Sequence, residues 1–168
     1  TPKHLHYIKE INKYVPNAIY IHIIRDGKEN IASLYHARNT YESWSKGRPV
    51  KGKSLERCIQ RWIKDINISK SYLGKKNHFH ISYDKLLINT DDLILQIFKS
   101  LSIDFNNISI NNSKYKKIIT ENEPWKINNS KIISKTKSKF DSVLSLKQKD
   151  TVLRKIKCVN IEKELEIR

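Results

Sequence analysis

Arg25 and Ser33 are the residues of this chain whose types and spacing point most directly to chemistry. Arg25 follows an apolar, largely β-branched run over residues 18–24, which predicts a buried parallel strand. Ser33 lies eight residues further on, about two turns into a helix expected over residues 27–37. A guanidinium at the carboxyl end of a strand, beside the N-terminus of the next helix, is a typical arrangement for binding phosphate. The spacing therefore predicts a phosphate site formed by Arg25 and Ser33.

The same two residues also have a purely structural interpretation. In it, Arg25 forms an ion pair with Asp26 in a surface turn, and Ser33 is a small residue that packs its helix against the sheet. The spacing alone leaves both interpretations open.

Helices and strands alternate along the part of the chain that would position these side chains. Ser54 and Ser145 are expected helix N-caps, and Gly74 is expected to end the helix that Ser54 begins. The expected elements are, in chain order, a helix over 4–15, a strand over 18–24, a helix over 27–37, a helix over 54–73, a strand over 78–83, a helix over 90–101 and a final helix from Leu146. Strands separated by helices predict an α/β fold with a parallel sheet flanked by helices.

Two polar segments interrupt this pattern. Residues 38–53 are rich in Lys, Gly, Ser and Asn and predict a surface loop. Residues from about 104 to 145 predict long connections with short ordered pieces. Several aromatic and imidazole side chains have helix or strand positions without ligand-like spacing, and we interpret them as structural: Trp62, His22, His78 and His80.

The composition narrows the function classes only in part. The chain has 168 residues and is 38% hydrophobic, which is enough for one domain with a core. Its 33 Lys and Arg against 17 Asp and Glu give a formal net charge of +16, which attracts phosphate, sulfate, nucleic acid or anionic polysaccharide. A coding bias toward Lys, Ile and Asn would produce the same excess, so the charge alone identifies no ligand.

Cysteine spacing and hydropathy argue against a zinc site and a membrane span. Cys58 and Cys158 lie far apart without metal-site spacing, and no disulfide framework is expected. No apolar run reaches the roughly 20 residues that span a bilayer, and the N-terminus does not resemble a signal peptide. The chain begins at Thr1 and contains no Met, so we expect an internal or C-terminal piece of a longer protein. A cytoplasmic location is expected unless the sequence before Thr1 carries an anchor.

Seven short segments carry a family resemblance through their order. They are Thr1-Pro2-Lys3-His4-Leu5, Val15-Pro16-Asn17-Ala18, Ile21-His22-Ile23-Ile24-Arg25-Asp26-Gly27-Lys28, Ala32-Ser33-Leu34, Arg57-Cys58-Ile59-Gln60-Arg61-Trp62, Ser82-Tyr83-Asp84-Lys85-Leu86 and Leu101-Ser102-Ile103. In this order they resemble the sulfotransferases that use 3′-phosphoadenosine 5′-phosphosulfate (PAPS). The resemblance covers roughly residues 1–105 and extends faintly to Glu123-Pro124-Trp125-Lys126.

The resemblance implies roles for five residues. Arg25 and Ser33 match positions that bind the 3′-phosphate of the donor, and Tyr83 matches a position near the adenine. His4 is the candidate catalytic base, because an imidazole with a pKa of about 6.5 suits removal of the acceptor's proton. Lys126 could close over the donor phosphates as part of a basic flap.

Structural alternatives remain open for two of these residues. Tyr83 could be an aromatic residue at a strand end that fills the core, and His4 could be a surface residue on the first helical turn. His6 is a second imidazole near the start of the chain, but it falls outside the matched segment.

The family also implies a fold and a reaction. We expect a P-loop-NTPase-like α/β domain that transfers a sulfuryl group from PAPS to a hydroxyl or amine of a small-molecule, carbohydrate, lipid or peptide acceptor, with no metal implied. The four glycines of the chain form no phosphate loop. We therefore expect residues 1–168 to be the C-terminal portion of one domain, lacking the first strand, phosphate loop and first helix, and inactive in isolation.

Two other function classes stay open. A basic nucleic-acid-binding module would use the +16 charge with the eight Tyr and three Trp as stacking groups. A nucleotide kinase of related fold would need a phosphate loop and a carboxylate for magnesium outside this chain.

Overall fold

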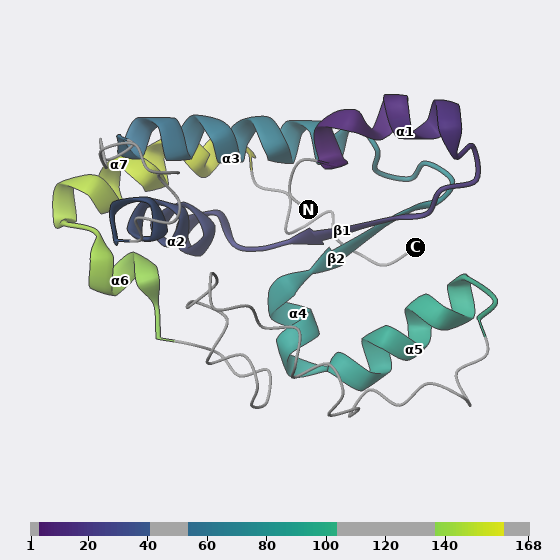
Figure 1. Cartoon of the computed structure of the whole chain (residues 1–168). Helices are drawn as coiled ribbons and strands as arrows, with labels where there is room; N and C mark the ends of the chain where they lie inside the picture. Colours follow the sequence, from purple (N-terminus) through teal and green to yellow (C-terminus); the bar gives the residue numbers. More distant parts are fainter. Residues whose placement is uncertain (1–3, 41–53, 104–136, 160–168) are drawn as a thin grey trace. The chain divides into compact units, whose positions relative to one another are not determined.

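The computed structural model describes residues 4–40, 54–103 and 137–159 (Figure 1). The chain divides into two compact units, one formed by Thr1–Asp84 with Lys137–Arg168 and the other by Lys85–Thr136. The strands and most of the described helices belong to the first unit.

Two parallel strands form the sheet of the first unit. β1 (Tyr20–Ile24) pairs with β2 (His78–Ser82) in a register that places Ile24 opposite Ser82. The pairing confirms the expected parallel arrangement, and β1 begins two residues later than expected. The expected burial of the strand is wrong for part of it, because Ile21 and Ile23 are exposed. Because both strands run in the same direction, the residues that follow them emerge at the same edge of the sheet.

Tyr83 was expected to end the second strand, and this is wrong. It is the first residue of α4 (Tyr83–Ile88), so β2 ends at Ser82 and passes directly into a helix. Leu86 and Leu87 are good helix formers and extend this helix.

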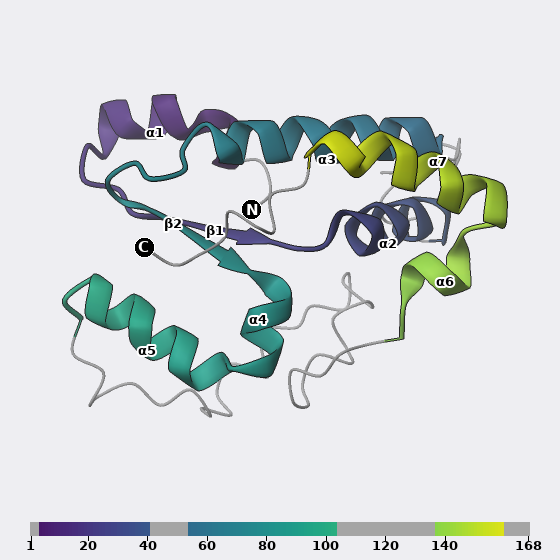
Figure 2. The ribbon, with the colours of Figure 1, turned by 180° about the vertical axis from the view of Figure 1, so that it is seen from behind.

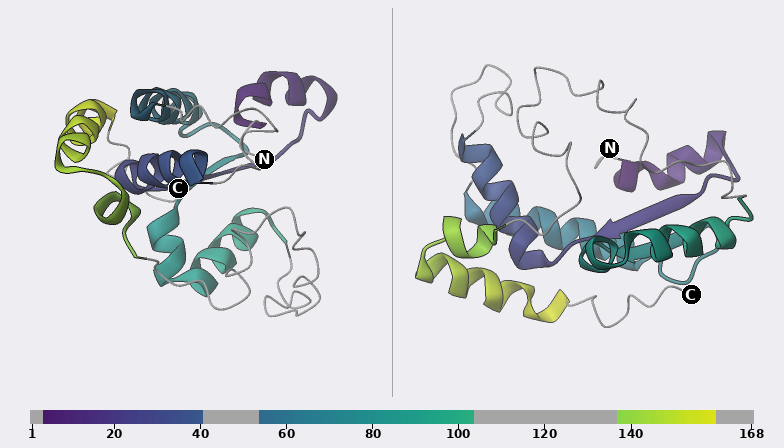
Figure 3. Two further views of the ribbon diagram at one scale, coloured as in Figure 1. Left: turned by 60° about the vertical axis from the view of Figure 1, so that its left-hand side comes forward. Right: turned by 90° about the horizontal axis from the view of Figure 1, so that it is seen from below.

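Helices from distant parts of the sequence form the rest of the first unit. They are η1 (His4–Tyr7), α1 (Ile8–Tyr14), α2 (Gly27–Thr40), α3 (Leu55–Lys70), α6 (Lys139–Val143), α7 (Leu146–Ile156) and η5 (Lys157–Val159). α2, α3 and α7 lie side by side, as seen from behind in Figure 2 and nearly end-on at the left of Figure 3. The segment containing α6 and α7, far from α2 and α3 in sequence, therefore completes one helical layer with them.

The helix boundaries confirm most of the expected caps. Ser54 and Ser145 accept hydrogen bonds from the N–H groups of Arg57 and Gln148, and Ser145 forms a full capping box. α3 ends at Lys70 instead of residue 73, because residues 71–74 form turns that finish at Gly74 with a φ of +68°.

α2 extends beyond its expected end at residue 37. It continues to Thr40, so residues 38–40 are helical and not part of the expected loop; the rest of that loop, residues 41–53, lies outside the described residues. The Asn39 side chain donates a hydrogen bond of 2.7 Å to the Tyr35 carbonyl inside this last turn.

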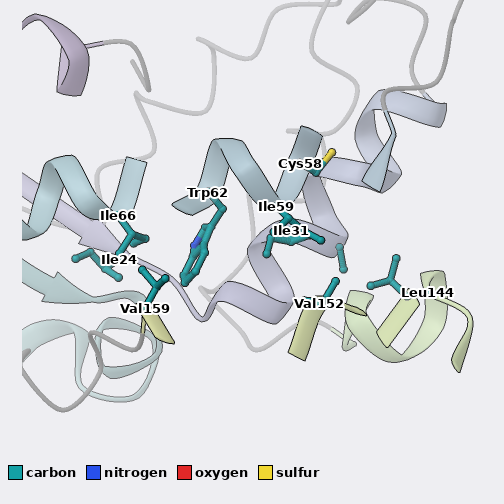
Figure 4. Close-up of a cluster of buried hydrophobic side chains, with 10 residues drawn as sticks. Ile24, Ile31, Cys58, Ile59, Trp62, Ile66, Leu144, Val152 and Val159 are labelled. Atoms are coloured by element: carbon teal, nitrogen blue, oxygen red, sulfur yellow. The ribbon is translucent and has the colours of Figure 1, made fainter. Parts of the chain in front are cut away.

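Buried side chains from α2, α3 and α7 meet in one core (Figure 4). Ile31 and Ile59 are fully buried and lie side by side between α2 and α3, and Val152 of α7 is equally buried. The cluster consists of Ile24, Ile31, Ala32, Cys58, Ile59, Trp62, Ile66, Leu144, Val152 and Val159. Trp62 belongs to this core, as its structural interpretation predicted.

The second unit contains α5 (Thr90–Ser100), whose N-cap is Asn89 and whose bounds lie within one residue of the expected helix over 90–101. The helix ends in a Schellman arrangement: the N–H of Ser102 bonds to the Lys99 carbonyl, and that of Ile103 to the Phe98 carbonyl. Ser102 has a φ of +54°, the left-handed conformation that such a helix end requires.

None of the helices in the described ranges combines the length and the apolar content needed to cross a bilayer.

Candidate functional site

Asp26 immediately precedes α2 and fixes the turn that follows β1. Its carboxylate accepts a 2.7 Å hydrogen bond from the Lys28 N–H, and its carbonyl accepts the Asn30 N–H at 2.9 Å. The Lys28 ammonium also lies 3.4 Å from the same carboxylate. The Asp26 side chain is thus engaged by the N-terminus of α2, and the alternative in which it pairs with Arg25 is wrong.

Arg25 lies between side chains from two different elements. One guanidinium nitrogen is 3.8 Å from the Glu29 carboxylate, and the guanidinium carbon is 5.3 Å from the centre of the Tyr83 ring. The register of the sheet explains the contact with Tyr83. Ile24 and Ser82 are paired, so the residues that come next, Arg25 and Tyr83, lie side by side. The structure therefore brings together two of the predicted site residues.

The Tyr83 ring is half-buried with its face toward Arg25. A cation over an aromatic face is stabilised by the charge distribution of the ring. This contact helps to orient the guanidinium. Tyr83 thus contributes to the surroundings of Arg25 rather than only filling a core position.

The Glu29 carboxylate was not recognised in the sequence, although it lies one helical turn after Arg25. It accepts hydrogen bonds from the Ser138 hydroxyl at 2.6 Å and from the Lys139 N–H at 2.9 Å. Ser138 is the N-cap of α6 and Lys139 is its first residue. Burial opposes its charge, but the bonds from Ser138, Lys139 and Phe140 and the attraction of Arg25 together lower the pKa of Glu29. Glu29 is therefore ionised at neutral pH and joins Arg25 to α6.

Ser33 lies on α2, four residues after Glu29 and eight after Arg25. Residues four apart share one helix face, so Ser33 follows Glu29 along that face, about 9 Å from the first residue of α2. Its side chain is half-buried. The structure thus places Ser33 on the expected helix. Within the described part of the chain, it shows no direct contact between Ser33 and Arg25.

A cavity of about 530 Å³ extends along β1 and brings His4 together with Arg25. Its walls include Asn30 from α2 and Trp62 and Asp65 from α3. Both of these lining residues were predicted as site residues, His4 as a base and Arg25 as a phosphate ligand. Ser33 and Tyr83 are not among the residues that line it.

His6 and Asp65 form a pair that the sequence did not indicate. The His6 Nε2 atom lies 2.8 Å from the Asp65 carboxylate, which also has Arg61 at 3.7 Å. The two partners are separated by 59 residues, so no local pattern could have revealed the contact. His6 is thereby joined to α3, and it is not among the residues that line the cavity with Arg25.

His22, His78 and His80 form a stacked cluster between the strands and α3. The rings of His22 and His80 are 4.3 Å apart, and His22 hydrogen-bonds to His78 at 3.0 Å and to the Ser69 hydroxyl at 3.0 Å. Burial, followed by repulsion from His80 and His78, lowers the pKa of His22 to about 4. These contacts agree with a structural role for the cluster.

Some expected residues cannot be placed. Lys126 and Trp125 lie outside the described residues. Within the ranges that the structure covers, no three His, Cys, Asp or Glu side chains gather as a metal site would require, and Cys58 and Cys158 form no disulfide.

Comparison with protein-family models matches residues 1–107 to the sulfotransferase family. The match spans more than half of the 168-residue chain and includes His4, Arg25, Ser33 and Tyr83. It ends before Lys126 and before α6 and α7. No curated protein and no solved structure matches the chain.

Proposed function

Because this chain belongs to the sulfotransferase family, we propose that it binds the 3′-phosphate of PAPS in a reaction that transfers a sulfuryl group to a hydroxyl or amine. The observation that supports this proposal is the position of Arg25. Its guanidinium follows β1, rests over Tyr83 and is 3.8 Å from Glu29, which is longer than a hydrogen bond. Its N–H groups therefore keep capacity for charge-assisted hydrogen bonds to a phosphate.

In this proposal Arg25 and Ser33 hold the 3′-phosphate and Tyr83 lies near the adenine. Lys126 would close over the donor phosphates. Contacts to a phosphate remote from the sulfur do not make or break bonds, but they position the donor for in-line transfer. The attacking oxygen or nitrogen of the acceptor forms a bond to sulfur as the bond from sulfur to the donor phosphate breaks. The products are the sulfated acceptor and 3′,5′-adenosine bisphosphate.

His4 is the proposed base for the proton that the acceptor loses. An imidazole can accept this proton at neutral pH when it lies within hydrogen-bond reach of the acceptor. The cavity supports His4 over His6, because His4 lines it with Arg25 and His6 does not. The acceptor itself is a small molecule, carbohydrate, lipid or peptide in this proposal.

We further propose that the whole domain has a P-loop-NTPase-like fold and that residues 1–168 form its C-terminal portion. The two parallel strands with flanking helices are compatible with that fold. A phosphate loop needs closely spaced glycines between a strand and a helix, and Gly27, Gly47, Gly52 and Gly74 do not have that spacing. The 5′-phosphosulfate would then be bound by sequence outside this chain.

Calorimetric titration with 3′,5′-adenosine bisphosphate and 5′-AMP tests the proposal. The wild-type chain should bind the bisphosphate more tightly, and Arg25→Ala should abolish that difference. Arg154→Ala is the matched control, because it removes the same charge from an exposed site on α7 that is paired only with Asp150 in the described structure. Equal affinities of the wild-type chain for both nucleotides would contradict the proposal.

The nucleic-acid alternative predicts a different ligand in calorimetric titration. It expects binding of a single-stranded oligonucleotide that weakens steeply with salt and does not depend on a 3′-phosphate. Loss of oligonucleotide binding in Arg154→Ala as well as Arg25→Ala would favour this alternative, since a diffuse basic surface uses many charges.

A further inference from the structure

Glu29 presents a charge problem for a phosphate that reaches from Arg25 to Ser33. Glu29 lies between the two in sequence, 3.8 Å from the Arg25 guanidinium and on the same face of α2 as Ser33, four residues later. A carboxylate in that position would repel the phosphate and compete with it for the guanidinium. The contacts of Glu29 show how the chain avoids this conflict.

The start of α6 occupies the hydrogen-bonding capacity of Glu29. Ser138 donates to one carboxylate oxygen at 2.6 Å and the Lys139 N–H to the other at 2.9 Å, both shorter than the 3.8 Å to Arg25. Ser138 is itself fixed, because its hydroxyl oxygen accepts the Asp141 N–H at 3.0 Å. The carboxylate is thus held toward α6, near enough to Arg25 to orient it and too far to bond to it.

We propose that Glu29 is the positioning residue for Arg25 and that Ser138 controls it by holding the Glu29 carboxylate on α6. The segment around α6 lies outside the family match over residues 1–107. The inference therefore assigns this segment a part in the donor site, although none of its described side chains needs to touch the ligand. It rests on the proposed function for the identity of the ligand.

Loss of the Ser138 hydroxyl should release the carboxylate toward Arg25. The pair then closes to hydrogen-bond length, and a phosphate must displace Glu29 before it can bind. An exposed or half-buried ion pair of this kind is weak, so we expect Ser138→Ala to weaken binding of 3′,5′-adenosine bisphosphate roughly threefold.

A double-mutant cycle separates this effect from simple loosening of α6. Glu29→Gln keeps an oxygen acceptor for Ser138 but removes the charge that competes for Arg25. Ser138→Ala should therefore weaken bisphosphate binding in the wild-type background and leave it unchanged in the Glu29→Gln background. Equal weakening in both backgrounds would overturn the proposal, because a purely structural role of Ser138 would not depend on the charge of Glu29.

Ser142→Ala is the matched control within the same short helix. The Ser142 hydroxyl donates to the Ser138 carbonyl at 2.8 Å, so this variant removes a hydroxyl contact of α6 without touching Glu29. It should leave bisphosphate binding unchanged. A loss as large as that of Ser138→Ala would contradict the proposal.

The side-chain Nε–Hε resonance of Arg25 gives a readout that needs no ligand. It can be assigned in NMR spectra from its disappearance in Arg25→Ala. Ser138→Ala should shift this resonance in the ligand-free chain, and the shift should vanish in the Glu29→Gln background. If the wild-type chain does not bind the bisphosphate but this cycle holds, the proposed ligand is wrong and the positioning role stands. An unmoved resonance in Ser138→Ala overturns the positioning role itself.

Discussion

The ring of Trp62 lies directly against the backbone of Gly27. A Cβ atom built on Gly27 would lie 2.6 Å from Cζ2 and 2.8 Å from Cη2 of this ring. Gly27 is the first residue of α2 and comes two residues after Arg25. Trp62 of α3 therefore determines how closely the turn that carries Arg25 can approach the core.

Gly27→Ala should destabilise the chain by about 1–3 kcal/mol, because the methyl group has no room beside a buried indole. Urea unfolding followed by circular dichroism measures this change. In the Trp62→Phe background the penalty should be smaller, since that substitution removes both atoms nearest the new methyl group. A stabilising Gly27→Ala would show that helix propensity outweighs the clash.

Acid should destabilise the folded chain through the histidine cluster. The pKa of His22 is lowered from 6.5 to about 4 by burial and by His80 and His78, so the folded state resists a proton that the unfolded chain accepts. The unfolding free energy should be level above about pH 6.5 and fall toward pH 4, with His22 contributing on the order of 2–3 kcal/mol. Urea unfolding between pH 4 and 8 measures this slope.

Substitution of His22 tests whether the cluster causes that slope. The surrounding groups are His78 and His80 on β2 and Tyr72, which stacks on His78 and carries the Lys75 ammonium 4.7 Å from its ring centre. His22→Gln should flatten the pH dependence between pH 6.5 and 4. His4→Gln, at an exposed position, should keep it, and an unchanged slope in His22→Gln would assign the effect to other groups.

The core should be sensitive to α7, although this helix lies outside the family match. Val152 is fully buried and its neighbour Leu153 is 46% exposed. Val152→Ala should therefore cost about 2–3 kcal/mol in thermal or urea unfolding, whereas Leu153→Ala should change little. Similar small losses in both variants would mean that α7 is not required for the core of the first unit.

Ser102→Gly should stabilise the end of α5. Ser102 holds a φ of +54°, which glycine adopts without steric cost, so we expect a gain of a few tenths to about 1 kcal/mol. Slower hydrogen exchange of the last α5 amides would report it. Ser100→Gly is the control with the opposite sign, because Ser100 lies inside the helix, where glycine costs about 0.5–1 kcal/mol. Faster exchange in Ser102→Gly would refute the prediction.

Local patterns predicted the elements of the first unit and the position of Arg25. The parallel strand before Arg25 and the caps at Ser54 and Ser145 depend on neighbours in sequence, and the structure confirms them. The errors in secondary structure occur at element ends, where a few residues can either continue or leave a helix. Tyr83 entered α4, and α2 ran on to Thr40.

The sequence by itself determined which side chains follow β1 and how they are spaced, because both depend on period and on nearest neighbours. Only the tertiary structure decided what surrounds them. Ser138 contacts Glu29 although 109 positions separate them in the sequence, and Asp65 contacts His6 at a separation of 59. Such contacts arise when buried apolar faces pack and carry polar groups from distant segments together, and no spacing within one segment contains that information.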